Sequence, residues 1–263
     1  MRISKIIFSS IVMASLLGMP SCAHQSGHRP RAEQQRMTSA DSDKAVSDNN
    51  IKGSSEQHTK KAASAADLKL PPSSLNGERM DGSEIFEKYN TAVFMVYTSD
   101  GINGYQGSGF FLNSNGLAVS NYHVFQGTSK GAEMIKLTGS DDVWKVTDVI
   151  HSDEEEDFII FKVNISNTNY IPLAENRPKV GSKVFAIGSP RGLENTFSSG
   201  EVSQWRDQNL MQISALIDHG SSGGALINEY GEAVGITSGS FYDGSQANLN
   251  YAWSVEAIKP YLN

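Results

Sequence analysis

The sequence predicts an all-β domain over residues 83–263, preceded by a long polar N-terminal segment. Short segments rich in Val, Ile, Phe and Tyr recur throughout this region, and Gly, Asn, Asp and Pro separate them. No regular alternation of strands with long helical patterns is present. Such spacing is typical of a β-barrel or β-sandwich rather than of βα units.

The expected strands are short and end at turn-forming residues. In chain order they span residues 92–98, 109–112, 117–121, 134–137, 143–150, 158–163, 183–187, 201–205, 210–216, 225–227, 232–237 and 249–253. Short helices are expected at residues 83–89 and 254–262, one at each end of the domain. Residues 198–200 (SSG) are expected to form a turn.

The candidate nucleophile lies in residues 220–224 (GSSGG), between two predicted strands. Glycines permit a sharp bend and let a substrate approach the backbone closely. They also leave backbone N–H groups that can converge on a developing oxyanion. A serine hydroxyl is a weak nucleophile at neutral pH, so it requires an imidazole base and a carboxylate that orients the imidazole.

The order of the candidate residues excludes one class of hydrolase. Three of the six histidines lie in the polar N-terminal segment (His24, His28 and His58), and the other three are His123, His151 and His219. No histidine follows Ser222. The α/β-hydrolases place their histidine after the nucleophile, so the order here is instead His, Asp, Ser.

His123 is the preferred base, because it stands where the second strand of a predicted hairpin with an Asn-Gly turn ends, within residues 107–124. A strand end is a rigid place to hold a base. His151 adjoins an acidic run at residues 153–156 and is expected to be a solvated loop residue. His219, three residues before Ser222, is expected to shape the substrate pocket.

Asp157 is the candidate orienting acid, because it begins the apolar segment 157–163. Burial at a strand entrance would protect its hydrogen bond to imidazole from competing water. The alternative is that Asp157 merely ends a solvated acidic loop. Its combination with His123 and Ser222 favours the functional interpretation.

Four segments in the same order resemble the trypsin-like peptidase domain of HtrA/Deg-type serine proteases. They are residues 107–124 (GSGF and N-x-HV), 157–163 (DFIIFKV), 186–193 (AIGSPRGL) and 220–235 (GSSGGAL). The resemblance implies a chymotrypsin-like fold of two six-stranded β-barrels. It makes His123 the base, Asp157 the orienting acid and Ser222 the nucleophile of a serine endopeptidase, with the N–H groups of Gly220 and Ser222 as the oxyanion hole.

The chain departs from the family pattern around the nucleophile. Asp218 and His219 replace the usual Asn-Pro, Ser221 replaces an asparagine, and Ala225 replaces a proline. These departures keep open the alternative of a catalytically silent pseudoprotease that acts as a binding module. Since residue 263 closely follows the last expected helix, we also expect a member without a PDZ domain.

Substrate preference rests on the position six residues before the nucleophile, which forms the pocket floor in trypsin-like folds. Leu216 occupies it, beside Ile217, so an apolar floor that accepts small or medium aliphatic side chains is expected. A shift of two residues would bring Asp218 into the pocket instead. The opposite wall of the pocket is expected to contain residues 238–240, including Ser238, and Tyr242.

The N-terminal 22 residues are interpreted as a secretory signal. A basic start precedes an apolar run of 14 residues at 6–19, too short to span a bilayer as a helix. The chain's only cysteine, Cys22, resembles the lipidated residue of a bacterial lipoprotein, although an ordinary signal cut near Ala23 is the alternative. Residues 23–82 would be a disordered linker, since no aromatic residue lies between Phe8 and Phe86. The expected location is the periplasm or cell surface, anchored to a membrane.

Charge and composition narrow the partners to protein or peptide substrates and a membrane. Residues 81–263 contain 22 Asp and Glu against 11 Lys and Arg, an acidic balance unsuited to nucleic acid. No metal site is expected because no histidine–carboxylate pair has ligand spacing. No cofactor is expected, and the oligomeric state is not predicted.

Overall fold

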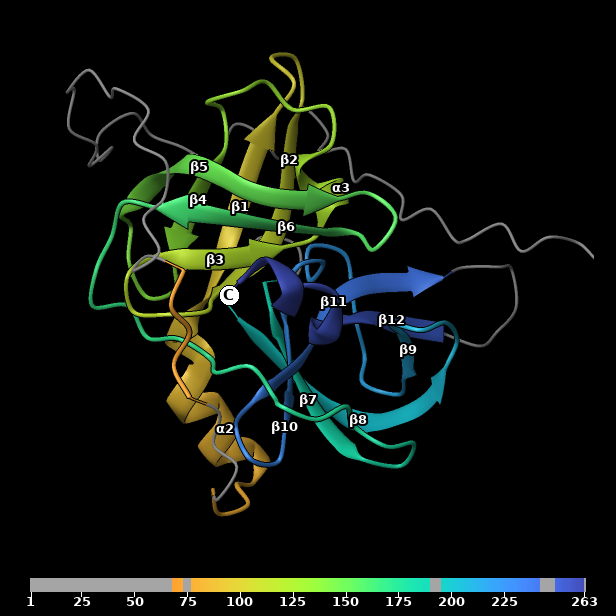
Figure 1. Ribbon diagram of the computed structural model, residues 1–263. Helices are drawn as coiled ribbons and strands as arrows, with labels where there is room; N and C mark the ends of the chain where they lie inside the picture. The colour runs from red at the N-terminus through yellow and green to blue at the C-terminus, as the bar shows by residue number, and fades with distance from the viewer. Residues whose placement is uncertain (1–67, 73–76, 190–194, 242–248, 263) are drawn as a thin grey trace, which may run out of the picture. The chain divides into compact units, whose positions relative to one another are not determined.

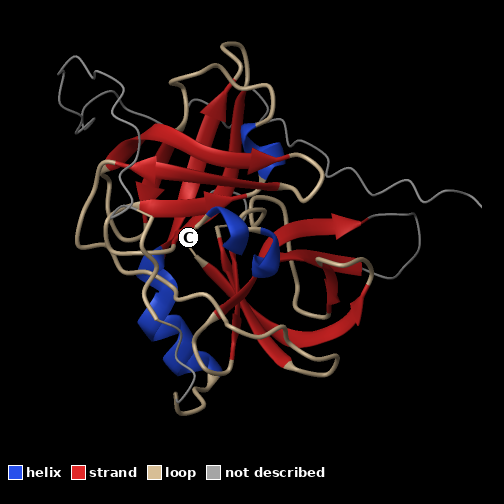
Figure 2. Ribbon diagram, in the orientation of Figure 1, coloured by secondary structure: helices blue, strands red, loops and turns tan. Residues whose placement is uncertain are grey.

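A computed structural model describes residues 68–72, 77–189, 195–241 and 249–262. Its strands form two closed antiparallel barrels of six strands each, coloured yellow to green and teal to blue in Figure 1. Helical segments are few and short (Figure 2). The predicted all-β double barrel is therefore confirmed.

Both barrels have the same strand order. The first contains β1 (Val93–Ser99), β2 (Gly104–Phe111), β3 (Leu117–Ser120), β4 (Met134–Leu137), β5 (Val143–Asp153) and β6 (Phe158–Val163). The second contains β7 (Lys183–Gly188), β8 (Thr196–Trp205), β9 (Leu210–Ile213), β10 (Ala225–Asn228), β11 (Ala233–Phe241) and β12 (Leu249–Ser254). The orders around the barrels are β1-β2-β3-β6-β5-β4 and β7-β8-β9-β12-β11-β10, so the second repeats the first.

The helix before the first strand is α2 (Gly82–Tyr89), and its start is fixed by a capping box. The Asp81 carboxylate accepts from the backbone N–H of Glu84, whose own carboxylate accepts from the N–H of Asp81. A 3₁₀ turn, η1 (Asn90–Ala92), leads from α2 into β1.

The C-terminal helix predicted at residues 254–262 is not one continuous helix. Two 3₁₀ turns, η3 (Val255–Ala257) and η4 (Lys259–Tyr261), occupy this segment. Pro260 lies in the second turn. Its missing N–H and its ring disfavour a continuous α-helix through this short segment.

Two local predictions in the barrels are also corrected. Residues 198–200 form part of β8 rather than a turn, with Ser199 opposite Phe185. His151 lies in β5 rather than in a solvated loop, and its ring stacks on Tyr261 with centroids 3.6 Å apart. The acidic run that follows His151 obscured the strand pattern in the sequence.

The domain begins earlier than residue 83. Leu68, Leu70 and Met80, all within the predicted linker, pack against the hydrophobic core. The backbone N–H of Met80 also donates to the carbonyl of Glu229 at 2.7 Å. The predicted signal and the rest of the predicted linker lie outside the described residues. Among the described residues, no helix is long and apolar enough to cross a membrane.

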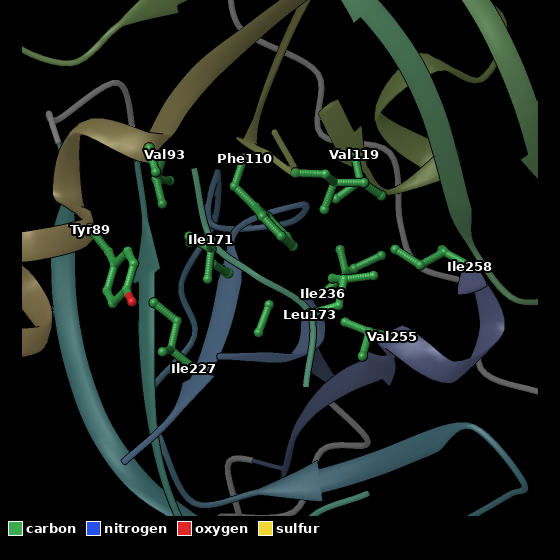
Figure 3. Packing of buried hydrophobic residues seen from close by; sticks show 14 of the residues in the cluster. Tyr89, Val93, Phe110, Val119, Ile171, Leu173, Ile227, Ile236, Val255 and Ile258 are labelled. Carbon is green, nitrogen blue, oxygen red and sulfur yellow. The ribbon is translucent and has the colours of Figure 1, made fainter. Parts of the chain in front are cut away.

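A shared hydrophobic core joins the two barrels. Each barrel has an interior cluster of its own, and a third cluster contains residues from both. Phe110 of β2 belongs to this third cluster together with Ile227 of β10 and Ile236 of β11 (Figure 3). Its neighbour Phe111 packs inside the first barrel, because successive strand residues point to opposite faces. The shared cluster fixes one barrel against the other.

Truncation of a side chain in this shared core is expected to cost much of the stability. Phe110→Ala removes a fully buried ring, and such a change destabilises by about 3–5 kcal/mol. Urea unfolding followed by circular dichroism measures the loss. Ile102→Ala is the matched control, since Ile102 is 90% exposed and its truncation should change stability by less than about 0.5 kcal/mol. Equal midpoints for the two variants would contradict the shared core.

Candidate active site

The pairing of β3 with β6 brings His123 and Asp157 together. His123 lies in α3 (Tyr122–Phe125), the single helical turn after β3, and Asp157 immediately precedes β6. Nδ1 of His123 lies 3.0 and 2.9 Å from the two carboxylate oxygens of Asp157. The backbone N–H of His123 also donates to Oδ1 of Asp157 at 3.0 Å. Both side chains are buried, with 8% and 7% of each residue exposed.

The backbone of Asp157 is held in an uncommon conformation. Its φ of 47° lies in the left-handed region, which aspartate tolerates better than most residues. The side chain of Asn121, itself fully buried, donates from Nδ2 to the carbonyl of Asp157 at 2.8 Å. Residues 121–123 therefore hold the acid at both ends, through its carbonyl and through its carboxylate.

The second barrel adds a third donor to this carboxylate. Ser238 of β11 donates from Oγ to Oδ2 of Asp157 at 2.8 Å. The sequence predicts Ser238 in a pocket wall and gives no indication of this bond, because a single serine in a strand carries no signal of its partner. The next residue, Gly239, lies beside Ser222: a Cβ built on Gly239 would be 3.6 Å from Oγ of Ser222.

Ser222 also lies close to strand β2 of the first barrel. A Cβ built on Gly107 would lie 2.7 Å from both methyl carbons of Val124 and 3.2 Å from the carbonyl oxygen of Ser222. Val124 directly follows His123 in the chain. The loop that carries Ser222 and the α3 turn therefore meet at Gly107, a position in β2 that has room only for glycine.

The loop of residues 220–224 takes its shape from two glycines. Gly220 and Gly223 have φ values of 92° and 90°, in the region that glycine adopts without strain. Between them Ser222 is 5% exposed. The carbonyl of Ser222 accepts from the N–H of Ser108 at 2.8 Å, while the N–H of Gly223 donates to the carbonyl of Thr237 at 2.7 Å.

The same loop leaves two backbone donors without protein acceptors. The carbonyl of Ser221 accepts from Oγ1 of Thr237 at 2.7 Å and from the N–H of Gly224 at 2.9 Å. Because the C=O and N–H of a trans peptide point in opposite directions, the N–H of Ser222 points away from these two groups. Among the described residues, the N–H groups of Gly220 and Ser222 donate to no protein acceptor. They can therefore serve an oxyanion.

Comparisons with known proteins agree with this geometry. A family model described as a trypsin-like peptidase domain matches residues 107–236. The chain is similar to a mitochondrial serine protease HTRA2 of Drosophila ananassae, with 29% identity over 194 residues that cover 69% of this chain and 44% of that protein. The corresponding protein of Drosophila virilis is 28% identical, with 69% and 45% covered. The chain thus spans less than half the length of these curated relatives.

A solved structure gives the same result. The crystal structure of the serine endoprotease from Yersinia pestis matches with a TM-score of 0.61 and 25% identity, covering 73% of this chain and 66% of that one. The described barrels are a trypsin-like peptidase domain of the HtrA type. The predicted family resemblance is confirmed.

The two residues predicted to floor the pocket of this HtrA-type domain lie on opposite sides of their segment. Leu216 is 70% exposed, while Ile217 is buried in the core cluster of the second barrel. Strand β9 ends at Ile213, but burial still alternates beyond it, so Ala215 and Ile217 face inward and Leu216 faces solvent. Ile217 therefore belongs to the barrel core rather than to a surface pocket, and the pocket role of Leu216 stays a prediction.

The other predicted positions are either exposed or outside the described residues. Asp218 and His219 are exposed, and the His219 N–H donates to the Asp218 carboxylate at 2.7 Å. Tyr242 and Cys22 lie outside the described residues. Within the described part of the chain, no group of three or more His, Cys, Asp or Glu residues could hold a metal ion.

Loss of the Asn121 amide is expected to destabilise the HtrA-type domain. Asn121→Ala leaves the carbonyl of Asp157 without its side-chain donor, and an unsatisfied buried acceptor costs about 1–3 kcal/mol. Urea unfolding of parent and variant measures the difference. Asn169→Ala is the control, because Asn169 makes the same kind of bond, to the carbonyl of Lys88 at 2.6 Å, in an exposed setting. An equal loss in both variants would contradict the importance of burial.

Proposed function

We propose that the protein is a serine endopeptidase in which His123, Asp157 and Ser222 form the catalytic triad. The observation that carries this proposal is the buried contact of His123 Nδ1 with both oxygens of Asp157. That contact leaves Nε2 as the ring nitrogen able to act as base. Ser238 donates a hydrogen bond to Asp157, and the next residue, Gly239, lies beside Ser222. This arrangement supports placing the Ser222 hydroxyl at Nε2 of His123.

Acylation would begin when Oγ of Ser222 attacks the scissile carbonyl while Nε2 of His123 accepts the hydroxyl proton. Asp157 would keep the other ring nitrogen protonated and stabilise the imidazolium that forms. The carbonyl oxygen would become an oxyanion bound by the N–H groups of Gly220 and Ser222. Collapse of the tetrahedral intermediate would break the peptide C–N bond, with the imidazolium donating its proton to the leaving amine.

Deacylation would repeat these steps with water as the nucleophile. His123 would accept a proton from the water as its oxygen attacks the ester carbon, and the same two N–H groups would bind the second oxyanion. Collapse would release the carboxylic acid product and return the proton to Oγ of Ser222. Every group required belongs to the protein, so the reaction would need no cofactor. The substrates would be proteins or peptides.

We also propose that the peptidase is exported and attached to a membrane through a lipid on Cys22. The basic start, the apolar run at residues 6–19 and the single cysteine directly after them support this proposal. The polar residues between Cys22 and the first packed residue, Leu68, would then act as a tether. The active site would face the periplasm or the cell surface.

A fluorophosphonate probe tests the proposed triad directly. The parent protein without residues 1–22 should be labelled on Ser222, whereas Ser222→Ala and His123→Ala should show no labelling above background. The reason is that only a hydroxyl activated by a base attacks phosphorus at a useful rate. Labelling is measured by in-gel fluorescence, with circular dichroism as the check on folding.

A matched control makes the result decisive. Ser199→Ala, in β8, should be labelled like the parent because Ser199 lies in the regular pair of β8 with β7 and not in residues 220–224, the nucleophile loop. A folded parent that is not labelled would overturn the endopeptidase proposal and favour the pseudoprotease, a binding module with the same barrels.

Lipid attachment is tested in a bacterial host fed an alkyne-tagged fatty acid. The full-length chain should incorporate the tag and fractionate with membranes, and Cys22→Ser should lose both properties because it lacks the only thiol. Ser21→Ala is the matched control and should keep them. Equal tagging of parent and Cys22→Ser, or an untagged parent that is exported, would contradict the anchor.

A further inference from the structure

We propose that Ser108, in strand β2 of the first barrel, is a positioning residue for the oxyanion hole of the second barrel. This inference rests on the proposed serine endopeptidase function. Ser108 would not touch the substrate. It would act on the reaction by fixing the direction of backbone groups in the nucleophile loop.

Ser108 connects three segments from a fully buried position. Its hydroxyl donates to the carbonyl of Gly220 at 2.7 Å and accepts from the backbone N–H of Ser189, after β7, at 2.8 Å. Its own N–H donates to the carbonyl of Ser222 at 2.8 Å. One residue of the first barrel therefore binds the carbonyls of both residues that carry the proposed oxyanion donors.

These bonds fix the peptide between Gly220 and Ser221 at both ends. Its carbonyl is held by Ser108, and its N–H donates to the carbonyl of Asp218 at 3.0 Å. Gly220 needs such a restraint, because a glycine with a φ of 92° has other backbone conformations close in energy. A rotation there would change the direction of the neighbouring N–H groups, and oxyanion stabilisation depends strongly on that direction.

The surroundings of Ser108 are closely packed. A Cβ built on Gly223 would lie 2.1 Å from the carbonyl oxygen of Ser108 and 2.3 Å from Oγ of Ser120. The nucleophile loop therefore packs directly on the backbone of β2. Removal of the hydroxyl would leave both Gly220 O and Ser189 N–H buried without this partner. The loop would have to move to satisfy its carbonyl.

The first arm of the test separates catalysis from stability. Ser108→Ala should lower kcat on fluorescently labelled casein about 10- to 100-fold with little change in KM, and slow fluorophosphonate labelling by a similar factor. The upper end stays below the roughly 10²- to 10³-fold loss that follows removal of an oxyanion donor itself. A KM-dominated loss, or an unchanged kcat and labelling rate, would overturn the inference.

A matched control addresses a purely structural role. Thr98→Val also removes a buried hydroxyl from the first barrel, one that donates to the carbonyl of Val124 at 2.9 Å and has no bond to the nucleophile loop. It should lower the melting temperature by an amount comparable to Ser108→Ala yet keep kcat. Equal losses of kcat in the two variants would assign the effect to stability and overturn the inference.

A conservative variant covers the case in which Ser108→Ala does not fold. Ser108→Cys keeps a weak donor at the same position, so its kcat should lie between those of the parent and the alanine variant. A cysteine variant that folds and retains the parent's kcat would overturn the inference. Failure of the proposed function gives a different result, because the parent itself would then not react with the probe.

Discussion

The buried carboxylate of Asp157 is the constraint on which the arrangement of this molecule depends. An ionised group removed from water is costly unless hydrogen bonds replace its hydration. Here the replacements are His123, through ring and backbone nitrogens, and Ser238, through its hydroxyl. One donor segment belongs to the first barrel and the other to the second. The full set of protein donors to this carboxylate is therefore present only when the barrels are docked.

Close backbone contacts of the nucleophile loop also depend on the docking of the two barrels. The nucleophile loop lies so near β2 and β7 that side chains would not fit at several positions. A Cβ on Gly223 would strike the carbonyl of Ser108, and a Cβ on Gly188 would lie 3.1 Å from Cα of Ser221. Gly223 thus serves contact between the barrels as well as the turn itself. This is why a local motif reports on a long-range arrangement.

The fold and the proposed triad could be predicted because each depends on local patterns. Strand β6 matches its prediction at both ends, since an apolar run of β-branched and aromatic residues is bounded by Asp157 and a turn. His123 could be chosen from six histidines by its place after a hairpin. The strand ends were less accurate: β9 ends at Ile213, three residues before its predicted end.

What could not be predicted depends on partners far apart in the chain. Ser108 and Gly220 are separated by 112 residues, and Ser238 and Asp157 by 81. A lone serine in a strand gives no indication of such a partner. Asn121 stands two residues before His123 within the recognised motif, yet its bond to the Asp157 carbonyl depends on the left-handed backbone at that residue. Sequence pattern alone does not report that conformation.

The two barrels support one another's chemistry in a reciprocal way. The first carries the proposed base and acid, and through Ser108 it holds the loop that carries the nucleophile. The second carries Ser222, and through Ser238 it holds the acid of the first. A displacement of either barrel would therefore disturb the acid and the oxyanion donors together, because both sets of bonds cross the same boundary. The family's Asn-Pro could then become Asp218-His219 without loss of these supports, since the loop's bond at Asp218 is made by a backbone carbonyl rather than by a side chain.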